Sequence, residues 1–180
     1  MRITGGVLRG RQVKVPAGLI RPAMDKMRES IFSILGDVSG ISFLDIFSGS
    51  GILALEAASR GAADIEAVEM DPLKRKTLLA NVKISPVRIN CRFMPAELYV
   101  KRAKRHFDII FCDPPFPYRY KWELLQAIAA SPLVKEGSRL LLHHPREDFE
   151  GKSWGNFVLE DTREYGRSTV FFFNFSCIKI

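Results

Sequence analysis

Short apolar runs alternate with helix-like segments through most of this chain, and this alternation limits the possible fold more than any other feature. The runs predict strands near residues 42–47, 64–70, 88–93, 107–112 and 138–143. The segments that predict helices lie near residues 51–60, 72–83, 96–104 and 120–130. Such alternation predicts a mainly parallel sheet covered by helices on both faces, the Rossmann-like, doubly wound α/β class.

The two ends of the chain depart from this alternation. Residues 1–16 combine apolar side chains with glycines, which predicts an amino-terminal β-hairpin. Residues 154–163 and 168–178 predict an antiparallel hairpin at one edge of the sheet. The length of 180 residues suits a single hydrophobic core. We therefore expect one domain over residues 1–180, with an extension at 1–20, a helix at 21–36 and a core at 42–180.

Basic residues are concentrated at the amino terminus. The chain has 27 Lys and Arg against 20 Asp and Glu, which gives a net charge of +7. The first 30 residues contain seven basic and two acidic side chains, so +5 of the +7 lies there. This asymmetry predicts a surface that binds a polyanion, with nucleic acid as the first candidate. A basic surface that only contacts solvent has the same composition and remains an alternative.

Composition argues against several other classes of protein. No apolar run approaches the roughly 20 residues that a membrane span needs, and the first residues do not resemble a signal peptide. We therefore expect a soluble, cytoplasmic protein, as a monomer and without a membrane partner. Cys91, Cys112 and Cys177 lie far apart in apolar segments, so we expect reduced core residues. No cluster of Cys and His has the spacing of metal ligands, and we expect no metal.

A glycine-rich turn follows the first predicted strand. Asp45 and Phe47 come just before it, and Gly49 and Gly51 lie within it, directly before a predicted helix. Glycines there allow a tight turn and a close approach of the backbone to a ligand at the helix amino terminus. The next strand ends at Glu69 and Met70, the place where such folds bind ribose hydroxyls.

The glycine turn by itself also fits a nicotinamide-dependent oxidoreductase. However, the strand, turn and helix around it contain no Lys or Arg to bind a pyrophosphate, whereas Asp45, Glu69 and Asp113 all lie along strand ends. Three carboxylates favour a cationic ligand, S-adenosylmethionine, over a dinucleotide. We expect Asp45 to hold its amine, the amides of the glycine turn to face its carboxylate, and Glu69 to bind its ribose. Met94 and Ala96, at the start of a later helix, would border its adenine.

The sequence Asp113-Pro114-Pro115-Phe116 closes an apolar run that predicts a buried strand. Proline cannot continue a strand ladder, so this segment is a rigid turn at the carboxyl end of the strand. It resembles the Asp/Asn-Pro-Pro-aromatic motif of amino-methyltransferases that use S-adenosylmethionine, although an ordinary strand-ending turn is the alternative. In the methyltransferase interpretation, the Asp113 carboxylate and the Pro114 carbonyl bind the target amine, Phe116 stacks on a flipped base, and Tyr118 extends that surface.

Further motifs occur in a fixed order along the whole chain. They are Ile3-Thr4-Gly5-Gly6, Arg9-Gly10-Arg11, Arg21-Pro22, Arg28-Glu29, Asp45-x-Phe47-x-Gly49-Ser50-Gly51, Ser59-Arg60-Gly61-Ala62, Glu69-x-Asp71, Asp113-Pro114-Pro115-Phe116 and Tyr165-Gly166-x-x-Thr169. With these motifs the chain resembles the RsmD family, S-adenosylmethionine-dependent methyltransferases of guanine N2 in bacterial 16S rRNA. The amino-terminal motifs and the Tyr-Gly hairpin are the most specific part of the match.

The resemblance implies a substrate and a binding surface. The substrate would be a guanine in 16S rRNA or in the assembling small ribosomal subunit. Arg9, Arg11, Arg21 and Arg28 would face the RNA. Departures from the family include the histidines at 143–144, which replace a stretch that is typically acidic and whose roles the sequence leaves open.

Two other functions remain open at this level. Adenine-N6 methylation of DNA would use the same Asp-Pro-Pro-Phe turn, although the chain has no separate domain for reading duplex sequence. A non-catalytic RNA-binding module that kept the fold would also have these motifs.

Overall fold

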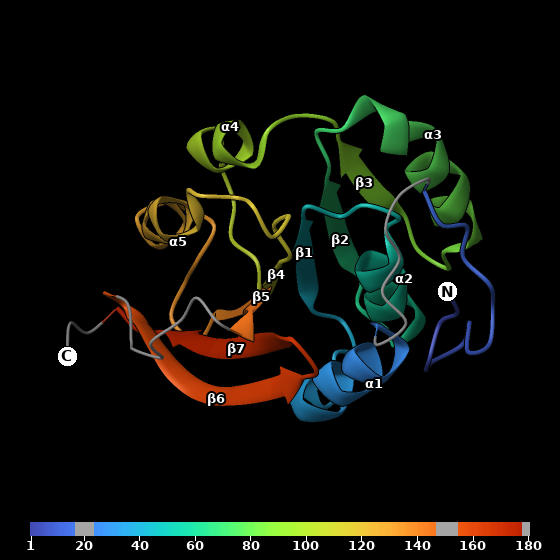
Figure 1. Cartoon of the computed structure of the whole chain (residues 1–180), viewed down its shortest axis with the longest axis horizontal. Helices are drawn as coiled ribbons and strands as arrows, with labels where there is room; N and C mark the ends of the chain where they lie inside the picture. The colour runs from blue at the N-terminus through green and yellow to red at the C-terminus, as the bar shows by residue number, and fades with distance from the viewer. Residues whose placement is uncertain (17–23, 147–154, 178–180) are drawn as a thin grey trace.

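The computed structural model of the chain describes residues 1–16, 24–146 and 155–177. Within them, seven strands form one sheet in the order β3-β2-β1-β4-β5-β7-β6 (Figure 1). The strands are β1 (Ser42–Ile46), β2 (Asp64–Val68), β3 (Ile89–Arg92), β4 (Ile109–Cys112), β5 (Arg139–Pro145), β6 (Phe157–Tyr165) and β7 (Ser168–Phe175). Strands β1 to β5 run parallel, and β7 is antiparallel to both β5 and β6. The predicted α/β class and the carboxyl-terminal antiparallel hairpin are confirmed.

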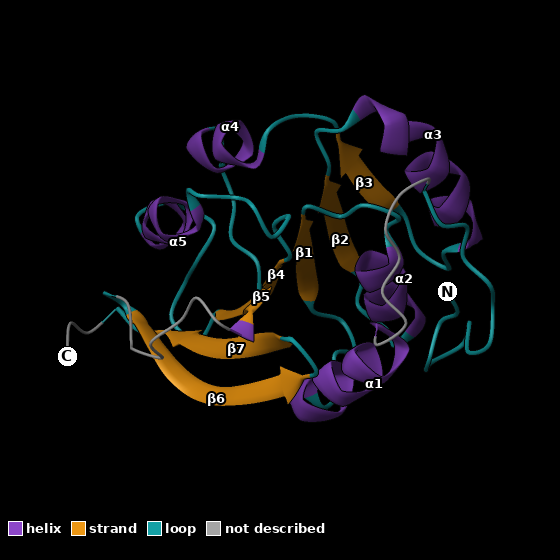
Figure 2. Ribbon diagram, viewed as in Figure 1, coloured by secondary structure: helices purple, strands orange, loops and turns teal. Residues whose placement is uncertain are grey.

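Helices cover both faces of this sheet (Figure 2). They are α1 (Met24–Leu35), α2 (Ile52–Ser59), α3 (Pro72–Asn81), α4 (Ala96–Lys101) and α5 (Lys121–Ala129), with a 3₁₀ turn at Val82–Ile84. Apolar side chains of α1 and α2 pack with Phe43 and Phe111 on one face. Those of α4 and α5 pack with Phe107 and Ile110 on the other face. Parallel strands buried on both faces explain why the runs in the sequence are continuously apolar.

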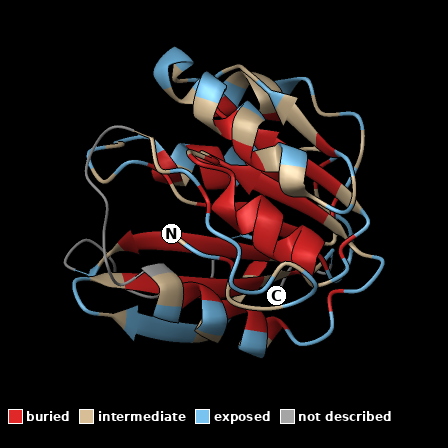
Figure 3. Ribbon diagram, turned by 90° about the vertical axis from the view of Figure 1, so that its right-hand side faces the viewer, coloured by how far each residue is buried: buried red, intermediate tan, exposed pale blue. Residues whose placement is uncertain are grey.

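Burial decreases from the centre of the sheet to its carboxyl-terminal edge (Figure 3). All four residues of β4 and all eight of α2 are buried. In the edge strand β6, buried and exposed residues are mixed, because only one of its faces packs on the core. The functional residues predicted from the sequence therefore lie at the ends of the most buried strands and not at the edge of the sheet.

The amino-terminal extension differs from the predicted hairpin. It is closed by a single antiparallel bridge between Arg2 and Gln12, and not by two strands. Backbone hydrogen bonds such as those from Ile3 to Arg11 and from Val13 to Met1 still join its two arms, and the Val7 amide donates to the Ser59 carbonyl of α2 at 2.8 Å. At Gly6, whose φ is +72°, an added Cβ would lie 1.8 Å from that carbonyl oxygen. The extension thus docks on α2 through a glycine contact that leaves no room for a side chain.

Arg28 corrects one prediction from the sequence, because it does not face RNA. Its side chain is fully buried, and its guanidinium donates to Asp25 at 2.6 Å and to the Arg2 carbonyl at 2.7 Å. The Glu56 carboxylate, also fully buried, lies 3.6 Å from the Arg28 Nε. A buried carboxylate needs a cationic partner, and Arg28 on α1 supplies it to α2. The basic count of the first 30 residues therefore overstates the charge available to a polyanion.

Arg28→Met should destabilise the protein without affecting RNA binding directly. Removing a buried guanidinium leaves the Arg2 carbonyl and Asp25 without its hydrogen bonds and, among the described residues, leaves Glu56 with only Arg60, at 3.2 Å, as an ion-pair partner. We therefore expect a loss of about 3 kcal/mol in the free energy of unfolding. Chemical denaturation measures this loss. The matched control is Arg9→Met, which removes an exposed arginine and should change stability little. Unchanged stability in Arg28→Met, together with weaker RNA binding, would instead support the prediction from the sequence that Arg28 faces the RNA.

Several remaining predictions can be compared with the described residues. The predicted helix at 21–36 is present from Met24, and Arg21 lies outside the described residues. Of the three cysteines, all are free, but only Cys112 is buried and Cys177 is exposed, against the prediction of three core residues. No helix among the described residues has the length and apolarity of a membrane span. In the same residues, no cluster of His, Cys, Asp and Glu could hold a metal ion. The division into domains stays a prediction.

Candidate active site

A cavity of about 760 Å³ lies at the carboxyl ends of the parallel strands. Its walls come from the segments that follow β1, β2 and β4, and from β5 and the amino-terminal extension. The sheet order changes direction between β1 and β4, and open α/β sheets bind ligands at such a switch point. The predicted site residues that line the cavity are Asp45, Phe47, Gly49, Glu69, Met70, Asp113, Pro114, Phe116 and Tyr118. Its volume is within the range of small-molecule sites.

Asp45 is a nearly buried carboxylate in the cavity wall, with 2% of its surface exposed. Its Oδ2 accepts a hydrogen bond from the Ser48 hydroxyl at 2.7 Å and a longer one from the Ala54 amide at 3.3 Å. Burial, with smaller contributions from the carboxylates of Asp113 and Glu69, raises the pKa of Asp45 to about 7 although these two hydrogen bonds lower it. A cation bound in the cavity would favour the ionised form of Asp45.

The turn after β1 has a strained backbone. Phe47 has a φ of +64°, which is uncommon outside glycine, and Gly51 has a φ of +79°. A Cβ at Gly51 would lie 2.6 Å from a methyl group of Leu78, so this position needs glycine for space as well as for its dihedral angle. The amides differ from the prediction: that of Gly49 donates to Glu69 and that of Gly51 donates to the Ser48 carbonyl, both at 2.8 Å. Neither faces a cofactor carboxylate in this structure, and Gly51 does not line the cavity.

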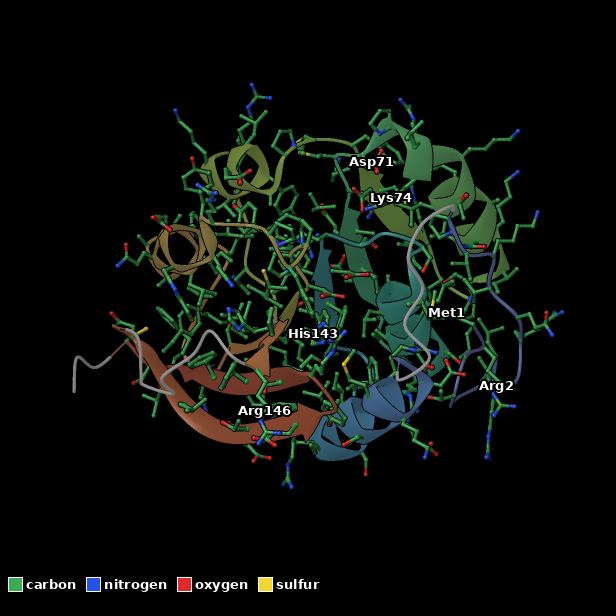
Figure 4. The ribbon with its side chains drawn as sticks, in the orientation of Figure 1. Met1, Arg2, Asp71, Lys74, His143 and Arg146 are labelled. Atoms are coloured by element: carbon green, nitrogen blue, oxygen red, sulfur yellow. The ribbon has the colours of Figure 1, made fainter. Side chains whose placement is uncertain are left out.

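Glu69 is fixed at the end of β2 by backbone amides on both of its carboxylate oxygens. The Gly49 amide donates to Oε2, and the Asp71 amide donates to Oε1, each at 2.8 Å. Lys74 lies 3.7 Å from Glu69 and 3.8 Å from Asp71, and Figure 4 shows Asp71 and Lys74 close together where α3 begins. Met70 is exposed beside them. Each Glu69 oxygen has a second lone pair, so both can still accept from a diol.

Asp113 lies next to His143 because the two follow paired positions of β4 and β5. Cys112 is in register with Leu142, so the next residues of both strands are neighbours at the sheet edge. The His143 Nδ1 lies 2.7 Å from the Asp113 Oδ1. The Phe116 ring lies edge-on to the His143 ring at a centroid distance of 5.9 Å. The Asp-Pro-Pro-Phe turn is thus joined to β5 through a histidine.

Aromatic contacts connect the two predicted halves of the site. Phe47 packs edge-on against Tyr118 at a centroid distance of 5.2 Å. The Tyr118 hydroxyl donates to the Glu97 carboxylate, and partial burial together with this carboxylate raises the pKa of Tyr118. Met94 and Ala96 lie beside Glu97 but are not part of the cavity wall, and Glu97 lines it in their place. The adenine contact predicted for Met94 and Ala96 therefore has no support from the cavity.

Sequence reasoning missed some of the residues that line this cavity. Met1, Val15 and Pro16 of the amino-terminal extension are part of its wall. Hydrogen bonds between Lys14 and Asn81 of α3 hold this part of the extension in place. No local pattern indicates such docking. His143, whose role the sequence left open, lines the cavity because it lies in β5, the strand that pairs with β4.

Two further predicted RNA contacts, Arg9 and Arg11, do not line the cavity. Arg9 and Arg11 are exposed on the amino-terminal extension. That extension also supplies cavity residues, so its exposed cations lie on the same structural unit as part of the cavity wall. Arg21 lies outside the described residues.

One cavity thus holds both parts that a group transfer from a cationic donor needs. Asp45 and Glu69 lie on the side of β1 and β2, and Asp113, Pro114 and Phe116 lie on the side of β4. The sheet order, the glycine turn and this placement define a Rossmann-like class I methyltransferase. This class, and not a nicotinamide-dependent oxidoreductase, makes use of the Asp-Pro-Pro-Phe turn.

Comparisons with known proteins identify the family within this class. The family model described as "Conserved hypothetical protein 95" matches residues 1–174. The chain belongs to this family, the RsmD family, as its motifs predicted. "Putative rRNA methyltransferase YlbH" of Bacillus subtilis is 32% identical over 94% of this chain and 96% of its own length.

Two further similarities come from Escherichia coli. "Ribosomal RNA small subunit methyltransferase D" is 39% identical over 64% of this chain and 60% of its own length. The solved structure of "Putative methyltransferase yhhF" superposes with a TM-score of 0.86 at 28% identity and covers 99% of both chains. The similarity therefore extends over the whole chain in fold as well as in sequence.

Proposed function

We propose that this protein transfers a methyl group from S-adenosylmethionine to the exocyclic N2 amine of a guanine in small-subunit rRNA. The single observation that carries the proposal is the shared cavity of Asp45, Glu69 and Asp113. Relatives of the same family are named as rRNA methyltransferases, which supports rRNA as the substrate. The guanine and its N2 amine come from the family resemblance and are the part to be tested.

S-adenosylmethionine is the cofactor of this chain, as the sequence predicted. When bound, it supplies an activated methyl group. The residues present fit two of its functional groups: Asp45 is a buried anion for the amine, and Glu69 has acceptors for the ribose. Phe47 and Met70 line the space between them. The amides of Gly49 and Gly51 already donate hydrogen bonds within the protein. The contribution of the glycine turn to ligand binding is therefore the space that it leaves.

Asp113 and Pro114 would position the target amine for an in-line displacement. The lone pair of such an amine is delocalised into the base, so it is a weak nucleophile. Hydrogen bonds from the amine to the Asp113 carboxylate and the Pro114 carbonyl favour a tetrahedral nitrogen, whose lone pair can point at the methyl group. Phe116 would stack on the base after it has left its helix. No strong base is needed, because the proton can leave after the transfer.

Identification of the methylated nucleoside tests the proposal. The protein is incubated with radiolabelled S-adenosylmethionine and, in separate reactions, undermodified small subunits, naked 16S rRNA and duplex DNA. We expect label in N2-methylguanosine from one of the RNA substrates. Label in N6-methyladenosine, or in DNA, would contradict the proposed substrate while leaving the methyltransferase class intact. The monomeric state and the cytoplasmic location also stay predictions.

The exposed arginines of the amino-terminal extension should strengthen RNA binding through contacts with phosphates. In the double variant Arg9→Gln/Arg11→Gln, we expect the Kd for RNA to increase about 5- to 20-fold at low salt. The slope of log Kd against log salt concentration should decrease by the equivalent of about one to two phosphate contacts. Binding measured at several salt concentrations gives both values.

The matched control is Lys101→Gln/Arg102→Gln, which removes two exposed cations at the end of α4. These two residues precede β4, at the end of the sheet opposite the cavity. Equal effects of the two double variants would mean that RNA binding depends on the net charge of the protein and not on the position of the cations. That result would contradict an RNA-binding role for the extension.

A further inference from the structure

The side chains of Asp113 and His143 lie on the same face of the sheet. Phe111 of β4 is in register with Leu141 of β5, and both pack into the core on the side of α1 and α2. Side chains alternate between the two faces along a strand, so the residues two positions further on, Asp113 and His143, point to that face as well. Both line the cavity, and the His143 Nδ1 lies 2.7 Å from the Asp113 Oδ1.

The direction of this hydrogen bond and the charge of the ring follow from the surroundings of His143. A carboxylate accepts, so Nδ1 carries the hydrogen and donates it. The ring is 3% exposed, and within the described part of the chain its Nε2 is buried without a hydrogen-bond partner. A protonated ring would bury a charged N–H there, which costs more than an unpartnered neutral nitrogen. His143 therefore donates as a neutral ring, and Asp113 keeps its full negative charge.

This hydrogen bond is what fixes the Asp113 carboxylate. Among residues 1–16, 24–146 and 155–177, His143 is the one hydrogen-bond or ion-pair partner of that side chain. The Asp113 side chain is 26% exposed, and two rotatable bonds would let its carboxylate adopt several orientations. The imidazole cannot turn in the same way, because it is buried and has the Phe116 ring edge-on against it at 5.9 Å.

We propose that His143 is the positioning residue for Asp113 in methyl transfer. Its Nδ1–H holds one carboxylate oxygen, so that the remaining lone pairs stay directed at the target amine. The inference rests on the proposed function and deepens it. A neutral donor suits this role, because the amine nitrogen becomes positively charged as it attacks the methyl group, and an uncompensated carboxylate stabilises that charge. The ring nitrogens themselves make no contact with the base in this arrangement.

Two substitutions of His143 separate the donor from the ring. His143→Phe keeps a ring and loses the donor, and should slow the chemical step about 10- to 100-fold, because a small misplacement of a reacting or binding group costs up to about 10²-fold. His143→Asn keeps an N–H near the Nδ1 position and should stay within about threefold of wild type. The Kd for S-adenosylmethionine should change less than about threefold in both. Single-turnover kinetics with saturating RNA and calorimetry measure these values.

A matched control and a double-mutant cycle make the result specific to Asp113. His106→Asn changes an exposed histidine that precedes β4, at the end of the sheet opposite the cavity, and should have the wild-type rate. His143→Phe is then measured again in the Asp113→Ala background, with enzyme in excess and a radiolabelled methyl group to follow slow transfer. If His143 acts through the carboxylate, the second substitution should change the rate less than about twofold there.

The same loss from His143→Phe in both backgrounds would overturn the inference, because His143 would then act through the fold and not through Asp113. So would a wild-type rate in His143→Phe, or a folded His143→Asn that is as slow as His143→Phe. Thermal unfolding shows whether each variant is folded, and His143→Leu removes the donor if the Phe variant does not fold. Failure of the wild type to methylate any guanine would contradict the proposed function itself, which differs from an active enzyme that does not depend on His143.

Discussion

Replacement of Asp113 by alanine is expected to lower the rate of methyl transfer by about 10²- to 10³-fold while S-adenosylmethionine still binds. The carboxylate is the acceptor that would hold the target amine, and the loss of one such group typically costs about 10²- to 10³-fold in rate. The variant also leaves the His143 Nδ1 without its partner, which loosens the same part of the cavity. Single-turnover kinetics with saturating RNA measures the chemical step, and calorimetry measures cofactor binding.

Two further variants make this result specific. Asp113→Asn keeps the shape of the side chain but removes its charge, and should retain more of the wild-type stability than Asp113→Ala. Glu123→Ala removes an exposed carboxylate from the first turn of α5 and should have wild-type activity. Full methyl transfer by Asp113→Ala would favour a non-catalytic role for the Asp-Pro-Pro-Phe turn. A parallel loss of cofactor binding would place Asp113 in the cofactor half of the site.

Asp45→Asn should weaken S-adenosylmethionine binding by about 10- to 100-fold at pH 8, since a hydrogen bond to a charged partner contributes about 1.5–3 kcal/mol. In the wild type, the affinity should rise as pH increases through about 7, because the pKa of Asp45 is raised to about 7 and the cation binds the ionised form. In Asp45→Asn this rise should be absent. Calorimetry in buffers with different ionisation enthalpies measures the proton release that accompanies binding.

The same substitution should have the opposite effect on the stability of the free protein. The pKa of Asp45 is raised in the folded state from its usual value of 3.8, so the stability linked to its protonation is complete below about pH 4 and is lost as pH rises through about 7. Asparagine imitates the protonated form. Asp45→Asn should therefore unfold at a higher temperature than wild type, by a margin that grows between pH 4 and pH 7. A lower melting temperature at pH 8 would show that the ionised carboxylate stabilises the free protein.

Local sequence patterns were enough to predict the strands and helices and the motifs at the ends of the strands. The apolar run before Asp113 predicts a strand because each of its residues is buried, whatever its neighbours in the sheet are. Asp45 and Glu69 were predicted because they follow such runs in a fold whose strands all end at one edge. Boundaries differ by a few residues, as at the end of β2, where backbone contacts beyond the run decide the last residue.

Pairings between distant residues could not be predicted in this way. Arg28 has the same charge as Arg9, yet one lies buried against Glu56 and the other is exposed. The difference depends on the packing of α1 against α2, which composition does not contain. The amides of the glycine turn are a similar case, because the Gly49 amide donates a hydrogen bond to the Glu69 carboxylate.

The amino-acid sequence by itself determined the alternation of strands and helices, the glycine turn and the Asp-Pro-Pro-Phe turn, because these depend on neighbours within a few residues along the chain. Only the tertiary structure decided that His143 meets Asp113, that Arg28 is buried, and that the amino-terminal extension forms part of the cavity wall. These contacts depend on strand order and helix docking, which bring together residues that are from 28 to more than 60 positions apart.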